Sequence, residues 1–137
     1  MRISIIADSS ALFSLFIETD TNYKKATIVI RKFATTKSYI IIPGEIFSEL
    51  INILGKKFGH LRAATVAQSI VETKLFSIEN TIHTVRSSAL KKFIKQPKKV
   101  SFTDCLVMAF ADHFETKDIF GFDESFRKNG YTRIGID

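Results

Sequence analysis

Short apolar runs, mostly rich in β-branched residues, recur along this chain and are separated by longer segments with helical spacing. Short runs that are apolar throughout are typical of strands covered on both faces of a sheet. The predicted strands are ISIIA (3–7), YIII (39–42), LFSIE (75–79), DIFGF (118–122) and TRIGI (132–136). They predict a central, mostly parallel sheet of four to five strands.

The intervening segments place apolar residues three and four positions apart, which is the pattern of amphipathic helices. In the second helix, Ile28 is expected to face inward. Ser101 and Asp104 resemble a capping box at the start of another. The predicted helices span residues 11–18, 21–35, 43–58, 61–73, 82–94 and 101–114, with a helical turn at 124–130.

Strands that alternate with helices predict an α/β protein with three layers, α/β/α. We find no internal repeat, low-complexity tract or linker, so we expect residues 1–137 to form a single domain. In sheets of this kind the functional crevice lies at the carboxyl ends of the strands. Residues at that edge are therefore the first candidates for a functional site.

Four acidic residues are predicted to lie at this edge. Asp8 and Asp123 each follow an apolar strand, and Glu49 and Asp104 lie near the starts of helices. Carboxylates gathered in one crevice repel one another unless a cation neutralises them. A set of oxygen ligands without His or Cys favours hard ions such as Mg²⁺ or Mn²⁺, which activate water and stabilise the leaving oxygen in phosphodiester cleavage.

Each acid also has a simpler structural interpretation. Asp8 and Asp123 can act as helix N-caps, and Asp104 can be an acid of a first helical turn. Glu49 can be a solvated helix residue, and Glu45 competes with it for a ligand role. The prediction of a metal site therefore depends on the joint arrangement, which local capping does not require.

Four segments, in this order, resemble the PIN-domain family over essentially the whole chain: ISIIADSSAL (3–12), IIIPGEIFSELINIL (40–54), SFTDCLVMAFA (101–111) and IFGFDESF (119–126). The resemblance implies a PIN-like fold and a Mg²⁺- or Mn²⁺-dependent endoribonuclease that cleaves single-stranded RNA. It also implies the toxin half of a VapBC toxin–antitoxin pair, a homodimer inhibited by an antitoxin protein. The implied catalytic and metal-binding residues are Asp8, Glu49, Asp104 and Asp123.

One position departs from the family pattern. Gly121 stands where members often carry Thr or Ser, two residues before the last Asp. This departure keeps an alternative open, a non-catalytic PIN-like module that binds RNA or protein. A further alternative is a nuclease that acts on flapped or single-stranded DNA. Ser10, two residues after Asp8, is predicted to be an auxiliary hydroxyl that points into the crevice.

The charge balance favours a polyanionic partner, because the net charge is +6 and the pI about 9.5. Lys98, Lys99 and Arg127 are predicted to contact RNA through its phosphates. The single cysteine, Cys105, excludes an internal disulfide and is typical of a reducing compartment. We find no apolar run long enough for a membrane span or a secretory signal, so a cytoplasmic protein is expected.

Overall fold

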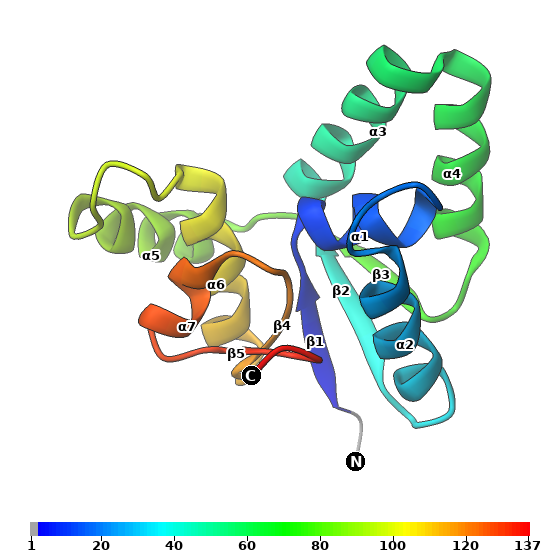
Figure 1. The fold of residues 1–137 in the computed structure, drawn as a ribbon. Helices are drawn as coiled ribbons and strands as arrows, with labels where there is room; N and C mark the ends of the chain where they lie inside the picture. The colour runs from blue at the N-terminus through cyan, green and yellow to red at the C-terminus, as the bar shows by residue number, and fades with distance from the viewer. Residues whose placement is uncertain (1–2) are drawn as a thin grey trace.

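In the computed structural model, which describes residues 3–137, five strands form an all-parallel sheet in the order β3-β2-β1-β4-β5 (Figure 1). The strands are β1 (Ser4–Ala7), β2 (Tyr39–Pro43), β3 (Phe76–Glu79), β4 (Asp118–Phe120) and β5 (Thr132–Arg133). All five predicted strands are present, although β4 and β5 end earlier than predicted. The predicted parallel sheet is confirmed.

Helices cover both faces of this sheet. They are α1 (Ser9–Phe16), α2 (Tyr23–Ala34), α3 (Gly44–Phe58), α4 (His60–Glu72), α5 (His83–Ile94), α6 (Phe102–His113) and α7 (Glu124–Lys128). Helices α1 to α4 lie on one side of the sheet and α5 to α7 on the other (Figure 1). The predicted three-layer α/β/α architecture is therefore confirmed.

The core lies along the central strand. Ile6 of β1 pairs with Ile41 of β2 on one side and with Ile119 of β4 on the other, and all three are fully buried. Burying one such side chain stabilises a protein by about 1.5–3 kcal/mol. A strand that is apolar on both faces is stable where a helix layer covers each side of the sheet.

The prediction for Ile28 of α2 is wrong, because its side chain is 65% exposed. The buried residues of this helix are Ala26 and Val29, and Phe33 packs partly against the core. These positions are three and four residues apart and form one stripe on the helix. Ile28 lies outside that stripe and faces solvent.

The topology places a switch point at the carboxyl end of β1. The chain runs from β1 to β2 and β3 on one side and later returns to β4 on the other side of β1. Ligands of open α/β sheets bind at such switch points, because the crossover helices diverge there. Asp8 follows β1 directly. No helix within residues 3–137 is long and apolar enough to cross a membrane.

Candidate functional site

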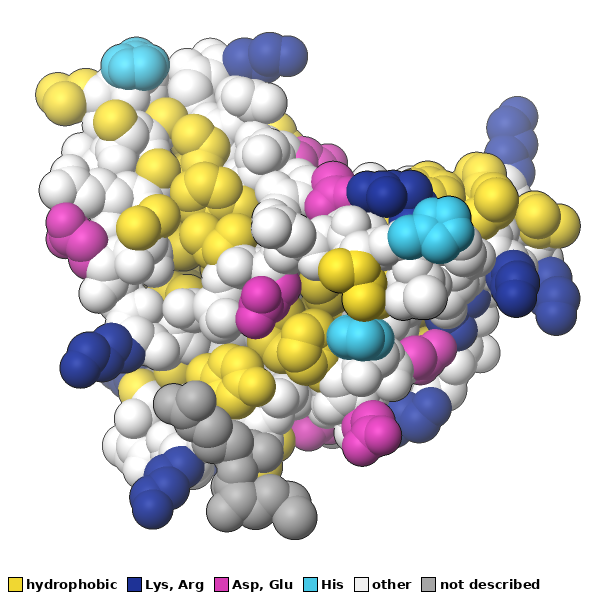
Figure 2. Space-filling view, turned by 180° about the vertical axis from the view of Figure 1, so that it is seen from behind, with side chains coloured by type: hydrophobic (Ala, Val, Ile, Leu, Met, Phe, Trp, Pro, Cys, Tyr) yellow, Lys and Arg dark blue, Asp and Glu magenta, His cyan; other side chains and the backbone are white. Residues whose placement is uncertain are grey.

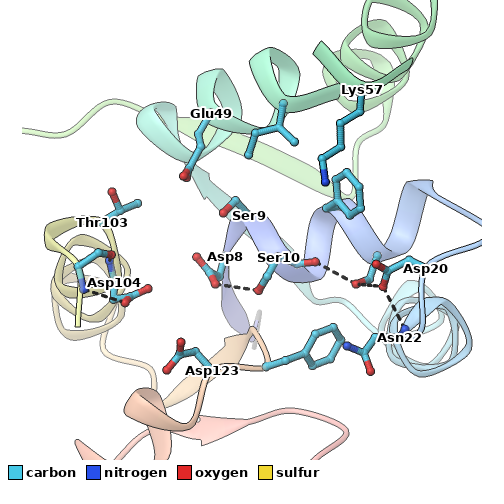
Figure 3. Close-up of a pocket in the computed structure, with 15 residues that line it drawn as sticks. Asp8, Ser9, Ser10, Asp20, Asn22, Glu49, Lys57, Thr103, Asp104 and Asp123 are labelled. Atoms are coloured by element: carbon cyan, nitrogen blue, oxygen red, sulfur yellow. Dashed lines mark hydrogen bonds between the residues drawn. The ribbon is translucent and has the colours of Figure 1, made fainter. Parts of the chain in front are cut away.

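A pocket of about 630 Å³ opens at this edge of the sheet (Figure 3). All four acids singled out in the sequence line it, together with the predicted auxiliary Ser10. They come from four separate segments, which are the β1–α1 junction, α3, α6 and the β4–α7 junction. The remaining lining residues are Ser9, Phe13, Ser14, Asp20, Asn22, Ile53, Lys57, Ser101, Thr103 and Phe122.

Asp8 is the most buried of the four acids, with 6% of its surface exposed. It occupies the N-cap position of α1, yet its side chain makes no capping hydrogen bond. Its carboxylate instead accepts a hydrogen bond from the Ser10 hydroxyl at 3.0 Å. Helix capping therefore does not account for this carboxylate, whereas a role in the pocket does.

The pKa of Asp8 is raised from 3.8 to about 6. Burial is the largest cause, and the charges of Asp104 and Glu49 add to it, while the Ser10 hydrogen bond opposes it. Burial and nearby like charges both disfavour the ionised form of a carboxyl group. A cation bound beside such a group offsets both effects. The surroundings of Asp8 therefore favour either a proton on its carboxylate or a bound cation.

Asp104 has a structural role as well as a place in the pocket. Ser101 and Asp104 form the predicted capping box, in which the Ser101 hydroxyl accepts from the Asp104 N–H and the Asp104 carboxylate accepts from the Ser101 N–H, both at 3.0 Å. Burial raises the pKa of Asp104, with the charge of Asp123 adding and the two bonds to Ser101 opposing. The box fixes the direction of this carboxylate toward the pocket.

Asp123 is held in a similar way, because its Oδ1 accepts a hydrogen bond of 2.8 Å from the Ser125 N–H at the start of α7. Glu49 reaches the pocket from α3 and points toward Asp8 and Asp104 (Figure 3). Glu45, its competitor in the sequence, bonds to the Thr81 hydroxyl at 2.7 Å and lines a different pocket. The structure thus distinguishes these two glutamates by location.

The acids of the pocket outnumber its cations strongly. Five of the chain's fourteen acidic residues line it, whereas Lys57 is the only Lys or Arg among the lining residues in the described part of the chain. This negative charge lies on a protein whose net charge is +6. Carboxylate oxygens are the preferred ligands of Mg²⁺ and Mn²⁺, so the donor set fits such an ion.

The side chains as placed do not form a closed coordination shell. Within residues 3–137, no three His, Cys, Asp or Glu side chains are close enough to hold one ion together. Mg²⁺ commonly binds through one or two carboxylates and keeps several of its waters. The pocket is wide enough for that mode of binding, in which some of the acids act through water.

Gly121 has a packing explanation. A Cβ atom at this position would lie 2.8 Å from Cε2 of Phe126 and 3.1 Å from Cβ of Asp8. Phe126 is fully buried, so its ring cannot move aside without cost. Glycine at this position allows the Phe126 ring and Asp8 to pack closely, and the Ser or Thr seen in the family pattern would force one of them to shift.

The predicted RNA-contacting cations lie outside the pocket. Lys98 and Lys99 belong to the segment before Ser101, and Arg127 pairs with Glu124 on α7. None of the three lines the pocket. Their predicted contacts with RNA stay a prediction for the surface around it.

Some residues of the pocket were missed from sequence. Lys57 and Ile53 follow Glu49 at intervals of four residues on α3, so all three share one helix face. That spacing was a usable signal for Lys57. Asp20 and Asn22 lie in the α1–α2 connection, and no periodic pattern pointed to them.

The chain matches the model of the PIN-domain family over residues 5–130. A comparison with solved structures finds the crystal structure of Mycobacterium tuberculosis VapC20, a sarcin–ricin loop-cleaving toxin, with a TM-score of 0.81. The two chains are 18% identical, and the match covers 95% of this chain and 98% of VapC20. No curated protein matches the sequence significantly.

Proposed function

The chain belongs to the PIN-domain family, and we propose that it is a metal-dependent endoribonuclease that cleaves single-stranded RNA. The observation that carries this proposal is the convergence of four carboxylates, from four segments of the chain, on one pocket at the switch point of the sheet. Capping roles explain Asp104 and Asp123 in part, but they explain neither Asp8 nor Glu49.

Asp8, Glu49, Asp104 and Asp123 are the residues proposed to hold Mg²⁺ or Mn²⁺, directly or through water. Such an ion, when bound, lowers the pKa of water and stabilises negative charge on phosphate oxygens. Ser10 keeps the Asp8 carboxylate directed by its hydrogen bond. Ser101 and Ser125 do the same for Asp104 and Asp123 through their backbone N–H groups.

Glu49 is the proposed proton acceptor. Within residues 3–137 it makes no hydrogen bond or ion pair, and its side chain is exposed in the pocket. In the hydrolysis, a water oxygen bonds to phosphorus and its proton passes to this carboxylate. The bond from phosphorus to a ribose oxygen breaks, and the leaving oxygen takes up a proton from solvent water. Asp8, Asp104 and Asp123 would hold the metal ion, which would supply the positive charge that orients the phosphate.

We further propose that the protein is the toxin of a type II toxin–antitoxin pair, acting in the cytoplasm. The neighbour of similar fold, VapC20, is a toxin that cleaves the sarcin–ricin loop. A homodimer and an antitoxin are the proposed protein partners. Exposed apolar side chains on α4 and α5 support such contacts: Leu61, Val71, Leu90, Phe93 and Ile94.

Figure 2 shows hydrophobic side chains gathered on the face opposite to that of Figure 1, over the lobe of α3 and α4 and at the end of α5. Contiguous apolar surface of this kind marks contact sites on proteins. Light scattering after size exclusion tests the dimer. A mass of one chain at high concentration would contradict it.

The ribonuclease proposal is tested with end-labelled RNA. The purified protein should cleave single-stranded RNA with Mg²⁺ or Mn²⁺ and should not cleave it with a chelator present. Asp104→Asn should abolish the activity, and double-stranded RNA and single-stranded DNA serve as comparison substrates. RNA that is bound but stays intact with either metal would support the non-catalytic module instead, and preferential cleavage of single-stranded DNA would support the deoxyribonuclease.

A further inference from the structure

We propose that the end of the pocket away from the four acids is a nucleobase subsite. In it, Phe13 and Phe122 hold a base of single-stranded RNA, Asn22 binds the polar edge of that base, and Lys57 binds a neighbouring phosphate. This inference rests on the proposed ribonuclease function and names the part of the pocket that binds the substrate. None of these four residues belongs to the acidic set. All four line the same continuous cavity as Asp8.

Two aromatic side chains give this end its character. Phe13 comes from α1 and packs against Phe58 with ring centroids 6.3 Å apart. Phe122 comes from the β4–α7 junction and packs edge-on against Phe120, also at 6.3 Å. Both side chains are half-buried and line the pocket, and neither packs against the other. The cavity therefore has aromatic surface available from two separate segments.

Lys57 supplies a cation that lies over one face of the Phe13 ring. Its Nζ lies 5.2 Å from the centroid of the Phe13 ring, and it has no ion-pair partner within residues 3–137. Figure 3 shows its side chain directed down from α3 into the pocket. An ammonium group in this place can bind the phosphate next to a stacked base.

Asn22 supplies a donor and an acceptor. Within residues 3–137 its side-chain amide makes no hydrogen bond, although it is half-buried and lines the pocket. Amide side chains pair with the donor and acceptor edges of bases. Leaving a half-buried carboxamide without a hydrogen-bond partner costs free energy. A ligand that supplies a donor or acceptor removes that cost and is therefore bound more tightly.

The backbone of Asn22 is held by a partly buried hydrogen-bond network. The hydroxyl of Ser14, which is 3% exposed, donates to Asp20 Oδ2 at 2.6 Å, and the backbone N–H of Asn22 donates to the same oxygen at 3.0 Å. Asp20 therefore ties the start of α2 to α1. The Asp20 carboxylate therefore positions Asn22. This role explains why an acidic residue lies at the aromatic end of the pocket.

The aromatic rings, the carboxamide and the ammonium group together favour one class of ligand. Aromatic rings favour a planar apolar face, the carboxamide favours a polar edge, and the ammonium favours an anion. A nucleotide has all three, and stacking on aromatic side chains accepts any base. With one phosphate of the stacked nucleotide on Lys57, the strand continues along the pocket, and its next phosphate reaches the acids, where the proposed cleavage takes place.

The test measures binding apart from cleavage. Fluorescence anisotropy with labelled oligoadenylate, oligocytidylate and oligouridylate in a chelator gives the Kd of wild type, Phe13→Leu, Phe122→Leu, Lys57→Gln and Asn22→Ala. Matched controls are Phe16→Leu on the same helix as Phe13, and Lys56→Gln, whose side chain lines a different pocket. Leucine keeps most of the apolar packing and removes the ring, so the variants should fold, which a thermal melt checks.

The two Leu variants and Lys57→Gln should each raise the Kd by roughly fivefold or more, while the controls stay at the wild-type value. Asn22→Ala should change the order of preference among the three homopolymers. In cleavage assays the same variants should raise KM and leave kcat unchanged within about threefold. The subsite proposal would be overturned if all four variants had the Kd and the base preference of the wild type. It would also be overturned if the wild type did not bind RNA.

Failure of the subsite and failure of the proposed function give different results. If the wild type cleaves RNA and the four variants bind it normally, the subsite is wrong and the ribonuclease proposal stands. If the wild type does not cleave RNA with either metal, yet binds it through these four residues, the subsite stands and the ribonuclease proposal fails.

Discussion

The two ends of the pocket differ in how their side chains are held. At the acidic end, three of the four carboxylates, those of Asp8, Asp104 and Asp123, each accept a hydrogen bond from a serine two or three residues away in sequence, and only Glu49 accepts none within residues 3–137. At the aromatic end, the side-chain amide of Asn22 and the ammonium of Lys57 have no hydrogen-bonding partner within residues 3–137.

This difference follows from what each end is proposed to do. Groups that stabilise developing charge are most effective when they are fixed before the reaction, because no reorganisation is then needed. Side chains that bind different bases need to change conformation from one base to another, so a fixed position is no advantage for them. We therefore expect changes at the acidic end to affect kcat or stability, and changes at the aromatic end to affect KM.

The largest effect is expected from Glu49→Gln, compared with Glu45→Gln. The two glutamates lie one turn apart on α3, but only Glu49 lines the acidic end. Loss of the proposed proton acceptor should lower kcat for RNA cleavage by roughly a hundredfold or more, and Glu45→Gln should stay within about threefold. Equal cleavage rates for the two variants would show that Glu49 is not the proton acceptor.

A large effect on stability is expected at Asp8. Its pKa is raised from 3.8 to about 6, so the folded protein holds this proton more tightly than the unfolded chain does. Protonated Asp8 therefore favours folding below about pH 4, and this contribution is lost as the pH rises to about 6. Above that, the ionised carboxylate lowers the free energy of unfolding by about 3 kcal/mol when no metal is bound.

Asp8→Asn should accordingly stabilise the metal-free protein at neutral pH by up to about 3 kcal/mol and should flatten its pH dependence between about pH 4 and 6. Urea unfolding in a chelator measures both quantities. The same pH dependence in wild type and variant would show that Asp8 does not carry this proton.

A smaller effect is expected from Gly121→Ala, which tests the junction between the two ends. The new Cβ would meet Phe126 and Asp8, and such overpacking destabilises by about 1–3 kcal/mol. Gly44→Ala is the control, because the nearest atom to a Cβ there is the Glu79 carbonyl oxygen at 3.6 Å. If both variants unfold at the wild-type urea concentration, the packing explanation for Gly121 is wrong.

The smallest effect is expected from Ser101→Ala. This change removes the hydroxyl that accepts from the Asp104 N–H, and loss of an N-cap costs about 1 kcal/mol. The Asp104 carboxylate still accepts from the backbone of residue 101, so cleavage should fall by only a few fold. A loss of activity as large as that of Asp104→Asn would mean that the hydroxyl has a part in the chemistry.

The sequence predicted the fold well because most buried strands are apolar throughout and most helices have a clear inward stripe. It also predicted that Asp8, Glu49, Asp104 and Asp123 share one crevice, since parallel strands end at one edge of the sheet. It failed for Ile28, where the stripe through Ala26 and Val29 is made of smaller residues than the exposed isoleucine.

The aromatic end could not be predicted in the same way. Phe13 and Phe122 are far apart in sequence, and Asn22 lies in a connection whose position depends on the bond from Ser14 to Asp20. Contacts of this kind depend on how loops pack in three dimensions. Local periodicity carries no information about them.

The central claim is that the acidic end binds a divalent cation, and calorimetric titration with Mn²⁺ tests it most directly. Wild type and Glu45→Gln should bind Mn²⁺ with equal affinity, whereas Asp8→Asn should bind it at least about tenfold more weakly. The claim would be contradicted if folded wild-type protein gave no heat of binding with Mn²⁺. It would also be contradicted if Asp8→Asn bound Mn²⁺ as tightly as the wild type.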